Sequence, residues 1–402
     1  MTPDETPAVY GELVGQEPVV EQLRLAAAAA SRGPGGAASR AASAGLGMTH
    51  AWLFTGPPGS GRSVAARAFA AALLCADQGC GQCPSCHQVA AGSHADLLLI
   101  RPDGLSYGVR QTRDLVLRAA AAPVYGRWRV VLFEDADRAT EQAANALLKA
   151  IEEPAPRTVW LLCAPSADDL PTTIRSRCRL VTLRTPPTAA VAEVLVRSGV
   201  SEDAALAAAR AAQGHIGRAR RLAIDPQTAS RRAEVLKVPM QVSGGLGHAL
   251  ASAADLVKAA EAEAAAITEE LDIPERDALR RAFGEGSTGK GVATAVRGAA
   301  GALKELEDRQ KSRATRLKRD ALDRALLDLA GFYRDVLAVQ FGADVELANA
   351  ARREELEQVA VISRPETTVR RIEAIMKCRE RLAASVAPLL AVEEMTLALA
   401  AR

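Results

Sequence analysis

A glycine-rich connection between an apolar run and a helix-forming segment constrains the fold of this chain more than any other part of the sequence. Residues 51–56 (AWLFTG) form a short apolar run typical of a buried strand, and a helix is expected from about Arg62 to Cys75. The connection over 56–63, GPPGSGRS, matches the phosphate-binding pattern G-x-x-x-x-G-K-[ST] except at Arg62. Consecutive backbone N–H groups and a helix N-terminus surround phosphate in such loops, so a strand–loop–helix unit is predicted.

Further short apolar runs alternate with helical patterns in the first half of the chain. Helices are expected over 109–122 and 140–153. Strands that alternate with helices indicate a parallel α/β sheet. The remaining expected strands are 97–100, 128–133, 159–164 and 179–183.

The strand signal ends at Pro186–Pro187, and the rest of the chain has a helical pattern. Residues 188–224 predict two or three short helices with breaks at Gly199 and Gly214. Three domains are therefore predicted: an α/β domain over 1–185, a small helical domain over 186–240 and an all-α domain over 241–402. Within the last domain, breaks are expected at Pro274, 284–291, Gly342 and Pro365. A Gly/Ala/Ser-rich stretch over 31–47 predicts a flexible insertion.

Composition narrows the class of protein. Of 402 residues, 49% are hydrophobic and 24% are charged, which is typical of a globular chain of roughly two to four domains. The 50 basic and 48 acidic residues leave a net charge of +2, so no global basic field attracts nucleic acid, and 3% aromatic residues do not favour a base-stacking surface. No apolar run predicts a membrane helix, and the N-terminus lacks a signal-peptide pattern, so a cytoplasmic protein is expected.

The glycine-rich loop is a candidate nucleotide site with one substituted residue. Gly56, Gly59 and Gly61 supply the loop, and Ser63 stands where a hydroxyl meets a magnesium ion. Arg62 replaces the usual Lys, and its planar fork cannot replace a compact ammonium between two phosphates. One alternative is a working ATP site. The other is a loop that keeps its fold but has lost catalysis, with Arg62 as a result of drift in a chain whose basic residues are mostly Arg.

An acidic pair follows the expected strand over 128–133. Acids at this place in P-loop ATPases hold magnesium and position water, and their usual order is Asp followed by Glu. Here the order is Glu134 followed by Asp135, whose shorter side chain would hold an attacking water poorly. A degenerate site is favoured over an active one, and both residues could also be solvated charges at a strand end.

Four cysteines lie within a dozen residues at the end of the first helix. Cys75, Cys80, Cys83 and Cys86 have the spacing of a tetrahedral sulfur site for structural zinc. A redox pair at Cys83 and Cys86, or plain reduced thiols, are the alternatives. The other three cysteines are expected to pack as small apolar side chains. They are Cys163, Cys178 and Cys378.

Arg177 is a candidate arginine finger. It lies in Ser176-Arg177-Cys178, directly before the strand expected over 179–183. An arginine exposed at this edge can reach the γ-phosphate held by a neighbouring subunit. The alternative is an ordinary solvated arginine, because the tripeptide alone is a weak signal.

Several of these features occur in one order along the chain: the glycine-rich loop, the four cysteines, the Glu134-Asp135 pair, NALLKAIEEP over 145–154 and Ser176-Arg177-Cys178. This series resembles the clamp-loader subunits of bacterial DNA polymerase III, which are AAA+ proteins. The resemblance covers roughly residues 10–235 and is only architectural beyond them. It implies a P-loop AAA+ domain with a zinc-binding insertion at 75–86, a helical lid and a C-terminal helical collar that holds subunits in a ring.

The departures from the motor subunits of this family, gamma and tau, are informative. Those subunits keep the P-loop Lys, the Asp-Glu pair and a Thr at sensor 1. Alignment back from Ser176 places Pro165 at that Thr, and the sensor 2 Arg falls on Gly217, with Arg218 one residue away. With Arg177 retained, these losses resemble the delta-prime type, a rigid subunit that lends its finger to an adjacent motor.

The resemblance implies a largely non-hydrolysing scaffold that helps to load the sliding clamp, beta, onto primed DNA. Its partners would be the gamma/tau and delta subunits, and DNA would be contacted through the assembled complex. Structural zinc is the implied cofactor, and ATP or ADP binding is expected to be weak or absent. The alternatives are an ATP-hydrolysing gamma/tau-type motor and, less favoured, an AAA+ enzyme of DNA repair or helicase loading.

One basic stretch near the C-terminal end of the chain has two interpretations. It could bind DNA, or it could be a solvated helix with ion pairs between residues i and i+4, which is favoured because acidic residues are interspersed. Its basic residues are Arg309, Lys311, Arg313, Arg316, Lys318, Arg319 and Arg324.

Overall fold

The computed structural model describes residues 7–31, 47–102, 104–282, 292–384 and 386–401. Most of the 31–47 insertion and the whole predicted break at 284–291 lie outside the described residues. The chain forms two compact units. One comprises Met1–Pro102 with Ser106–Ile224, and the other Asp103–Leu105 with Asp225–Arg402. The sequence predicts three domains where the structure has two compact units. The three-domain division therefore stays a prediction.

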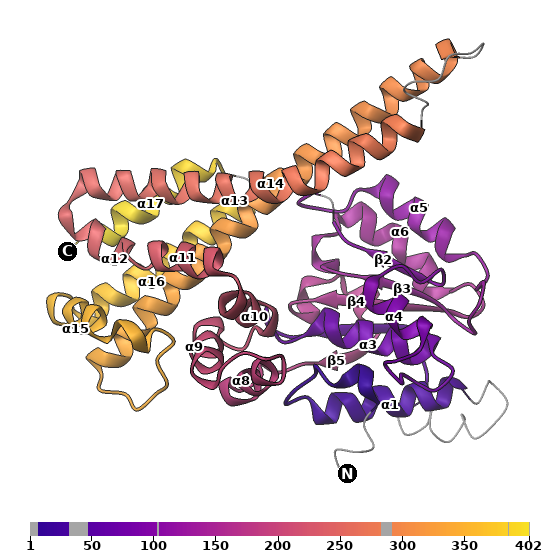
Figure 1. Ribbon diagram of the computed structural model, residues 1–402, viewed down its shortest axis with the longest axis horizontal. Helices are drawn as coiled ribbons and strands as arrows, with labels where there is room; N and C mark the ends of the chain where they lie inside the picture. The colour runs from indigo at the N-terminus through magenta and orange to yellow at the C-terminus, as the bar shows by residue number, and fades with distance from the viewer. Residues whose placement is uncertain (1–6, 32–46, 103, 283–291, 385, 402) are drawn as a thin grey trace. The chain divides into compact units, whose positions relative to one another are not determined.

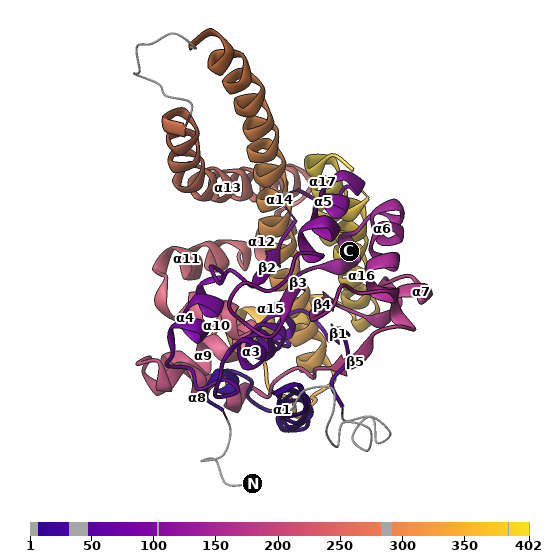
Figure 2. The same cartoon turned by 90° about the vertical axis from the view of Figure 1, so that its right-hand side faces the viewer.

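A five-stranded parallel sheet forms the centre of the first unit. Figure 1 labels four of its strands, and Figure 2 labels all five. The strand order is β2-β3-β4-β1-β5, so β1 lies between β4 and β5. Each strand lies within one residue of its expected bounds, and the predicted parallel α/β class is confirmed. The strands are β1 (Ala51–Thr55), β2 (Leu97–Ile100), β3 (Arg129–Phe133), β4 (Thr158–Ala164) and β5 (Arg179–Thr182).

Helices cover both faces of this sheet because every central strand is apolar on both sides. Side chains alternate between faces along a strand, and Trp52 and Phe54 of β1 pack in one core while Leu53 packs in the other. The first core includes α1 (Glu17–Ser31) and α3 (Arg62–Leu74). The second includes α5 (Val109–Ala119), α6 (Glu141–Glu152) and α7 (Thr172–Arg175).

Three short helices complete the first unit after the sheet. They are α8 (Thr188–Arg197), α9 (Glu202–Ala212) and α10 (Ile216–Ile224), and they pack around a small alanine-rich core of their own. Gly199 and Gly214, with φ of 90° and 89°, end α8 and α9 as predicted, because this left-handed backbone suits glycine.

The second unit is all-helical within the described residues. Two long helices, α13 (Leu246–Ala282) and α14 (Val292–Gln340), run side by side (Figure 1) and together supply half of the buried residues of its main core. The shorter helices are α11 (Pro226–Val235), α12 (Val238–Gln241), α15 (Arg353–Ile362), α16 (Pro365–Ala383) and α17 (Pro388–Ala400).

The predicted break at Pro274 is wrong. Pro274 lies inside α13, which continues to Ala282. Proline removes one helical hydrogen bond, but Arg313 of α14 pairs with Asp272 and Glu275 on either side of it, so helix–helix contacts hold the α13 backbone there. None of the described helices is long and apolar enough to cross a membrane.

Candidate functional site

The carboxyl ends of three adjacent strands bring the predicted nucleotide-site residues to one edge of the sheet. The glycine-rich loop follows β1, Glu134 follows β3, and Pro165 follows β4. The Gly56 N–H donates to the Pro165 carbonyl at 3.1 Å. Ligands of parallel α/β proteins bind at this edge, so the loop stands where a P-loop requires it.

Glycine is required at the predicted positions of the loop. Gly56, Gly59 and Gly61 have φ values of 150°, 89° and 90°, which other residues rarely adopt. A Cβ on Gly59 would lie 2.5 Å from the Cβ of His215, which precedes α10. The helical segment after the sheet therefore packs directly against the phosphate-binding loop.

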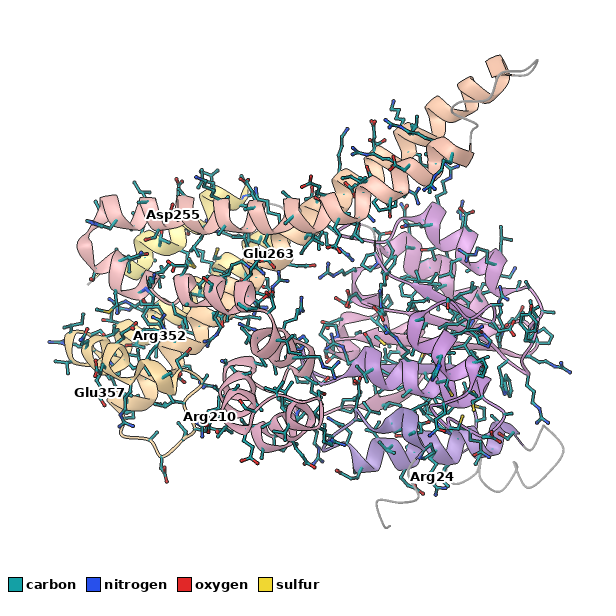
Figure 3. All side chains as sticks on the ribbon, viewed as in Figure 1. Arg24, Arg210, Asp255, Glu263, Arg352 and Glu357 are labelled. Carbon is teal, nitrogen blue, oxygen red and sulfur yellow. The ribbon has the colours of Figure 1, made fainter. Side chains whose placement is uncertain are left out.

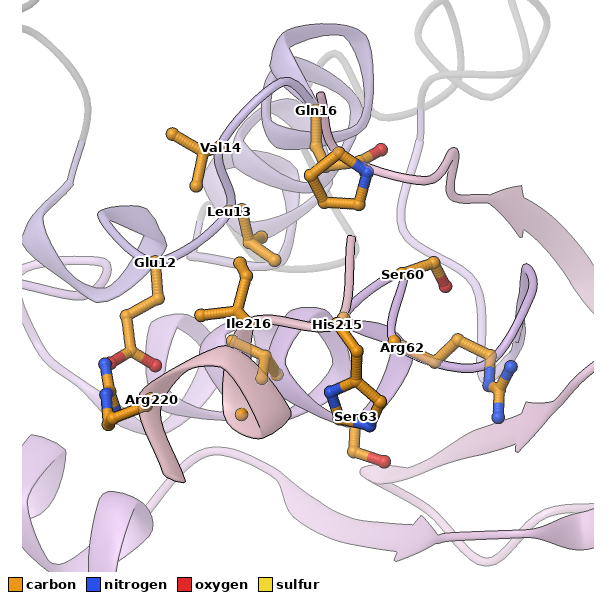
Figure 4. A pocket seen from close by; sticks show the side chains of 15 residues that line it. Glu12, Leu13, Val14, Gln16, Ser60, Arg62, Ser63, His215, Ile216 and Arg220 are labelled. Carbon is orange, nitrogen blue, oxygen red and sulfur yellow. The ribbon is translucent and has the colours of Figure 1, made fainter. Parts of the chain in front are cut away.

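A cavity of about 270 Å³ opens beside this loop (Figure 4). Its opposite wall comes from the N-terminal segment, where Glu12 pairs with Arg220 of α10 at 2.9 Å. The buried Gln16 amide donates to the Arg184 carbonyl at 2.6 Å and accepts from the Arg184 N–H at 3.2 Å. The cavity is thus bounded by the loop, by α10 and by the segment that precedes α1.

The two polar side chains after the loop are already engaged within the chain. Arg62 extends away from Glu12 and Arg220 and donates to the Gly56 carbonyl of its own loop (Figure 4). Ser63 lies near the buried Cys163 thiol, whose pKa is raised by burial and by the nearby charge of Glu134. Arg62 would have to move before it could contact a nucleotide.

Two arginines hold the carboxylate of Glu134. Its Oε1 lies 3.0 Å from Arg67 Nη2 of α3, and its Oε2 lies 2.9 Å from Arg101 Nε, which follows β2. The Glu134 side chain is only 13% exposed, so both oxygens that could coordinate magnesium are occupied by guanidinium groups in a partly buried place.

Asp135 is the more accessible acid of the pair. It adopts a left-handed backbone with φ of 50°, and its carboxylate lies 3.9 Å from Arg138.

Burial and the neighbouring Asp135 charge raise the pKa of Asp137, whose Oδ1 is buried without a hydrogen-bond partner in the structure.

His215 is neutral in the ordinary pH range. Burial, followed by the charges of Arg221 and Arg218, lowers the pKa of His215 to about 4. Its Nδ1 accepts the Arg218 N–H at 3.2 Å. Gly217, the predicted sensor 2 position, lines the cavity, and the basic side chain that lines it from α10 is Arg220.

The four predicted metal ligands converge. Cys75, Cys80, Cys83 and Cys86 have sulfur atoms within 4.8 Å of one another, and Cys75 Sγ lies 3.7 Å from the sulfurs of both Cys80 and Cys83. A tetrahedral zinc with bonds of about 2.3 Å separates its sulfurs by about 3.8 Å. The set can therefore hold a metal ion, and its geometry fits structural zinc.

Backbone N–H groups support the thiolate form of Cys75, whereas burial raises the pKa of Cys86. The Asp77 N–H donates to Cys75 Sγ at 3.3 Å, and the Cys86 N–H donates to Cys83 Sγ at 3.4 Å. Burial alone would raise the pKa of Cys75, but the N–H groups around its sulfur outweigh burial and lower that pKa to about 7. Of the other cysteines, Cys163 and Cys378 are buried and Cys178 is partly buried, as small apolar side chains would be.

Arg177 lies on the turn between α7 and β5. Its Nη1 donates to the Thr173 carbonyl at 2.8 Å, and its Nη2 lies 2.6 Å from Glu152 Oε1. The Arg177 side chain is 39% exposed. Its own chain thus fixes the guanidinium at the surface, and its use by another subunit stays a prediction.

The basic stretch of α14 pairs mainly with a neighbouring helix. Arg313 contacts Asp272 and Glu275 of α13, and Arg324 Nη2 lies 2.7 Å from Glu263 of the same helix, labelled in Figure 3. Lys318 contacts Glu261 of α13. The acidic partners are distant in sequence and lie across a helix–helix contact, so the expected i,i+4 spacing does not describe these pairs.

Sequence reasoning missed the residues that restrain the site. Arg67 lies on the predicted helix five residues after Arg62, so its proximity to Glu134 could have been anticipated from the strand order. His215 lies in the stretch where the sensor 2 Arg was expected, so its proximity to the site could also have been anticipated. Nothing in the sequence indicated that Arg101 would reach the same edge, because its position depends on how the loop after β2 folds back.

Part of this chain is similar to a family of known proteins. Residues 40–187 match the family model described as DNA polymerase III, delta subunit. The DNA polymerase III subunit delta' of Pseudomonas aeruginosa is 40% identical over 161 residues, which cover 39% of this chain and 49% of that protein. The predicted resemblance to delta-prime clamp-loader subunits is confirmed.

Two further relatives set the extent of this resemblance. The subunit delta' of Bacillus subtilis is 31% identical over 50% of this chain and 62% of its own length. The subunit gamma/tau of Mycobacterium tuberculosis is 34% identical over 48% of this chain and 31% of its own length. The chain thus spans about half the length of the delta' relatives that it matches, and this clamp-loader similarity lies in part of the chain only.

Proposed function

We propose that this chain is a delta-prime-type subunit of a DNA polymerase III clamp loader that hydrolyses little or no ATP by itself. It would act as a scaffold and donate Arg177 to the ATP site of an adjacent gamma/tau subunit. The complex would load the sliding clamp onto primed DNA in the cytoplasm, with the delta subunit as a further partner. Primer-template DNA would be contacted through the complex.

The state of Glu134 is the observation that carries the non-hydrolysing part of this proposal. Phosphoryl transfer needs a cation between phosphate oxygens and an acidic ligand, and it needs a positioned water. Arg67 and Arg101 occupy both oxygens of Glu134, Arg62 contacts its own loop, and Pro165 offers no hydroxyl. Each restraint opposes a different requirement, so together they favour a pocket that binds nucleotide weakly and does not turn it over.

The four cysteines fit a structural role in the same subunit. Four sulfurs complete a tetrahedral site and leave no position for a substrate. Zinc held by Cys75, Cys80, Cys83 and Cys86 would stabilise the loop after α3 and would not take part in chemistry.

A motor subunit of the gamma/tau kind is the second candidate, because the gamma/tau relatives match 48% of this chain at 34% identity. The two functions differ in a simple measurement. ATP turnover is compared for the isolated chain, for the gamma/tau–delta complex and for the complex with this chain, each with clamp and primed DNA. Stimulation of the complex by a chain that is inactive alone supports the scaffold, whereas turnover by the isolated chain supports the motor.

A further inference from the structure

The cysteine loop has a second face that touches the N-terminal segment. Gly79 and Gly81 lie among the four cysteines and have φ values of 103° and 78°. A Cβ on Gly79 would lie 2.5 Å from Val9 Cγ2, and a Cβ on Gly81 would lie 2.8 Å from the Cβ of Ala8. The Val9 N–H also donates to the Gly79 carbonyl at 3.3 Å. The backbone of the cysteine loop is therefore in direct contact with Ala8 and Val9.

These two residues belong to a compact turn that continues into the nucleotide cavity. The Gly11 N–H donates to the Ala8 carbonyl at 3.1 Å, and the Leu13 N–H donates to the Tyr10 carbonyl at 2.9 Å. Glu12 and Leu13 then line the cavity. Only two residues separate the contact at Val9 from the ion pair between Glu12 and Arg220. A short hydrogen-bonded turn therefore connects Val9 to the cavity wall.

We infer that the four-cysteine site is a positioning element for the nucleotide cavity: when it holds metal, it fixes the wall formed by residues 8–16. The metal constrains Cys80 and Cys83, which flank Gly81, and this constraint keeps the two glycines in the left-handed backbone that Ala8 and Val9 contact. Loss of the metal makes the cysteine loop mobile. The turn that contacts it then loses its position, and the ion pair between Glu12 and Arg220 weakens. The inference rests on metal binding at the cysteines, and not on whether the chain hydrolyses ATP.

The competing account is that apolar anchors alone hold the wall. Tyr10 and Leu13 are 2% and 7% exposed and pack in the core between α1 and α3. If these anchors suffice, metal loss stays local to the cysteine loop. The two accounts differ in whether the backbone amides of residues 9–13 lose protection together with those of the loop.

Hydrogen–deuterium exchange of the full chain separates the two accounts. We compare the zinc-loaded chain, the same chain after removal of zinc by a chelator, and the Val9→Ala variant. This variant keeps all four thiols but removes the side-chain methyl groups that contact Gly79. Cys178→Ser is the matched control, because Cys178 belongs to the same unit but is not among the four ligands. Metal content is measured for every sample.

Zinc removal should speed exchange in residues 9–13 by about tenfold or more and leave β1, β3 and β4 protected, as expected for local opening. Val9→Ala should give a smaller increase in the same residues with one zinc retained, and Cys178→Ser should give none. Zinc loss without faster exchange in residues 9–13 overturns the inference and leaves the proposed function intact. Absence of zinc from the purified chain overturns the metal assignment itself.

Discussion

The guanidinium of Arg177 lies 2.6 Å from the carboxylate of Glu152, which is in the segment 145–154. Both side chains are about two-fifths exposed, at 39% and 43%, so the pair is solvated and contributes little to stability. The pair holds the long Arg177 side chain in one direction, so the proposed finger would lose less conformational freedom on contact with a phosphate. Two segments of the family resemblance thus meet at one surface site.

Arg177→Ala should lower ATP turnover of the assembled complex while leaving assembly and the fold of this chain intact. An arginine finger stabilises charge in the transition state and can contribute about 10³–10⁵ in rate at the site that it serves. The loss for the complex should be partial, because other sites keep their own fingers. Turnover and clamp loading are measured on complexes purified by size.

Arg175→Ala is the matched control for the finger. Arg175 is the last residue of α7, is 38% exposed and pairs with Asp168, so its removal should leave turnover of the complex unchanged. Unchanged clamp loading by the Arg177→Ala complex, or equal losses for both variants, would show that Arg177 is not a finger.

Cys83→Ser should release zinc from a chain that otherwise carries one zinc. Binding energy of a structural metal is part of the folding free energy, so the melting temperature of the variant should fall by about 5 °C or more. Metal analysis by mass spectrometry and a thermal scan give the two results. Purified wild-type chain without zinc would contradict the assignment, and Cys178→Ser with full zinc content is the control.

Much of the fold could be predicted because its signals are local. Short apolar runs such as 97–100 mark strands that are covered on both faces, and Gly199 and Gly214 mark helix ends. The break expected at Pro274 failed because a local rule was overridden by contacts between α13 and α14. The contacts of Arg313 with Asp272 and Glu275 span 41 and 38 positions, and such distant contacts leave no periodic pattern in a sequence.

In the candidate site, too, the features encoded within one segment could be predicted from the sequence, and the contacts between distant segments could not. The loop from Gly56 to Ser63 and the four cysteines are set by spacing within one segment, so their positions followed from motifs. The pairing of Glu134 with Arg101, and of Glu12 with Arg220, depends on which loops meet at the sheet edge. Sequence reasoning therefore located the pocket but not the contacts that restrain it.

Arg313→Ala should weaken the fold of the second unit and leave DNA affinity unchanged. The Arg313 side chain is 18% exposed and contacts Asp272 and Glu275 at 2.6 Å and 2.5 Å. Removing it leaves two carboxylates without their main partner, which costs about 1–3 kcal/mol of unfolding free energy. Urea unfolding measures the loss, with the exposed Lys311→Ala as control. Reduced DNA affinity of the complex at unchanged stability would instead support a DNA-binding helix.

His215 should make the first unit less stable in mild acid. Its pKa is about 4 in the folded chain, below the usual value of 6.5, so the unfolded state binds the extra proton as pH falls. The contribution to stability is therefore full above pH 6.5 and is lost progressively as pH falls from 6.5 to 4. His215→Gln should flatten this part of the stability profile. Equal slopes for both chains between pH 7 and pH 5 would argue against a buried neutral His215.

The last prediction concerns restoration of the P-loop lysine. Arg62→Lys alone should not confer ATP turnover on the isolated chain, because Arg67 and Arg101 still hold Glu134 and Pro165 still lacks a hydroxyl. Arg62→Ala should likewise leave clamp loading by the complex nearly unchanged. The equivalent change in a gamma/tau partner should abolish loading, since catalysis there depends on charge neutralisation at the phosphates.

A double variant tests the restraint on Glu134 directly. Arg101→Gln frees one carboxylate oxygen for a cation, so Arg62→Lys with Arg101→Gln should gain magnesium-dependent nucleotide affinity that neither single change gives, as expected for coupled residues. Calorimetry with ATP, with and without magnesium, measures the gain, and Arg138→Gln, which weakens the contact with the neighbouring acid Asp135, is the control. Micromolar ATP affinity of the wild-type chain, with turnover that Arg62→Ala removes, would overturn the scaffold and favour the motor.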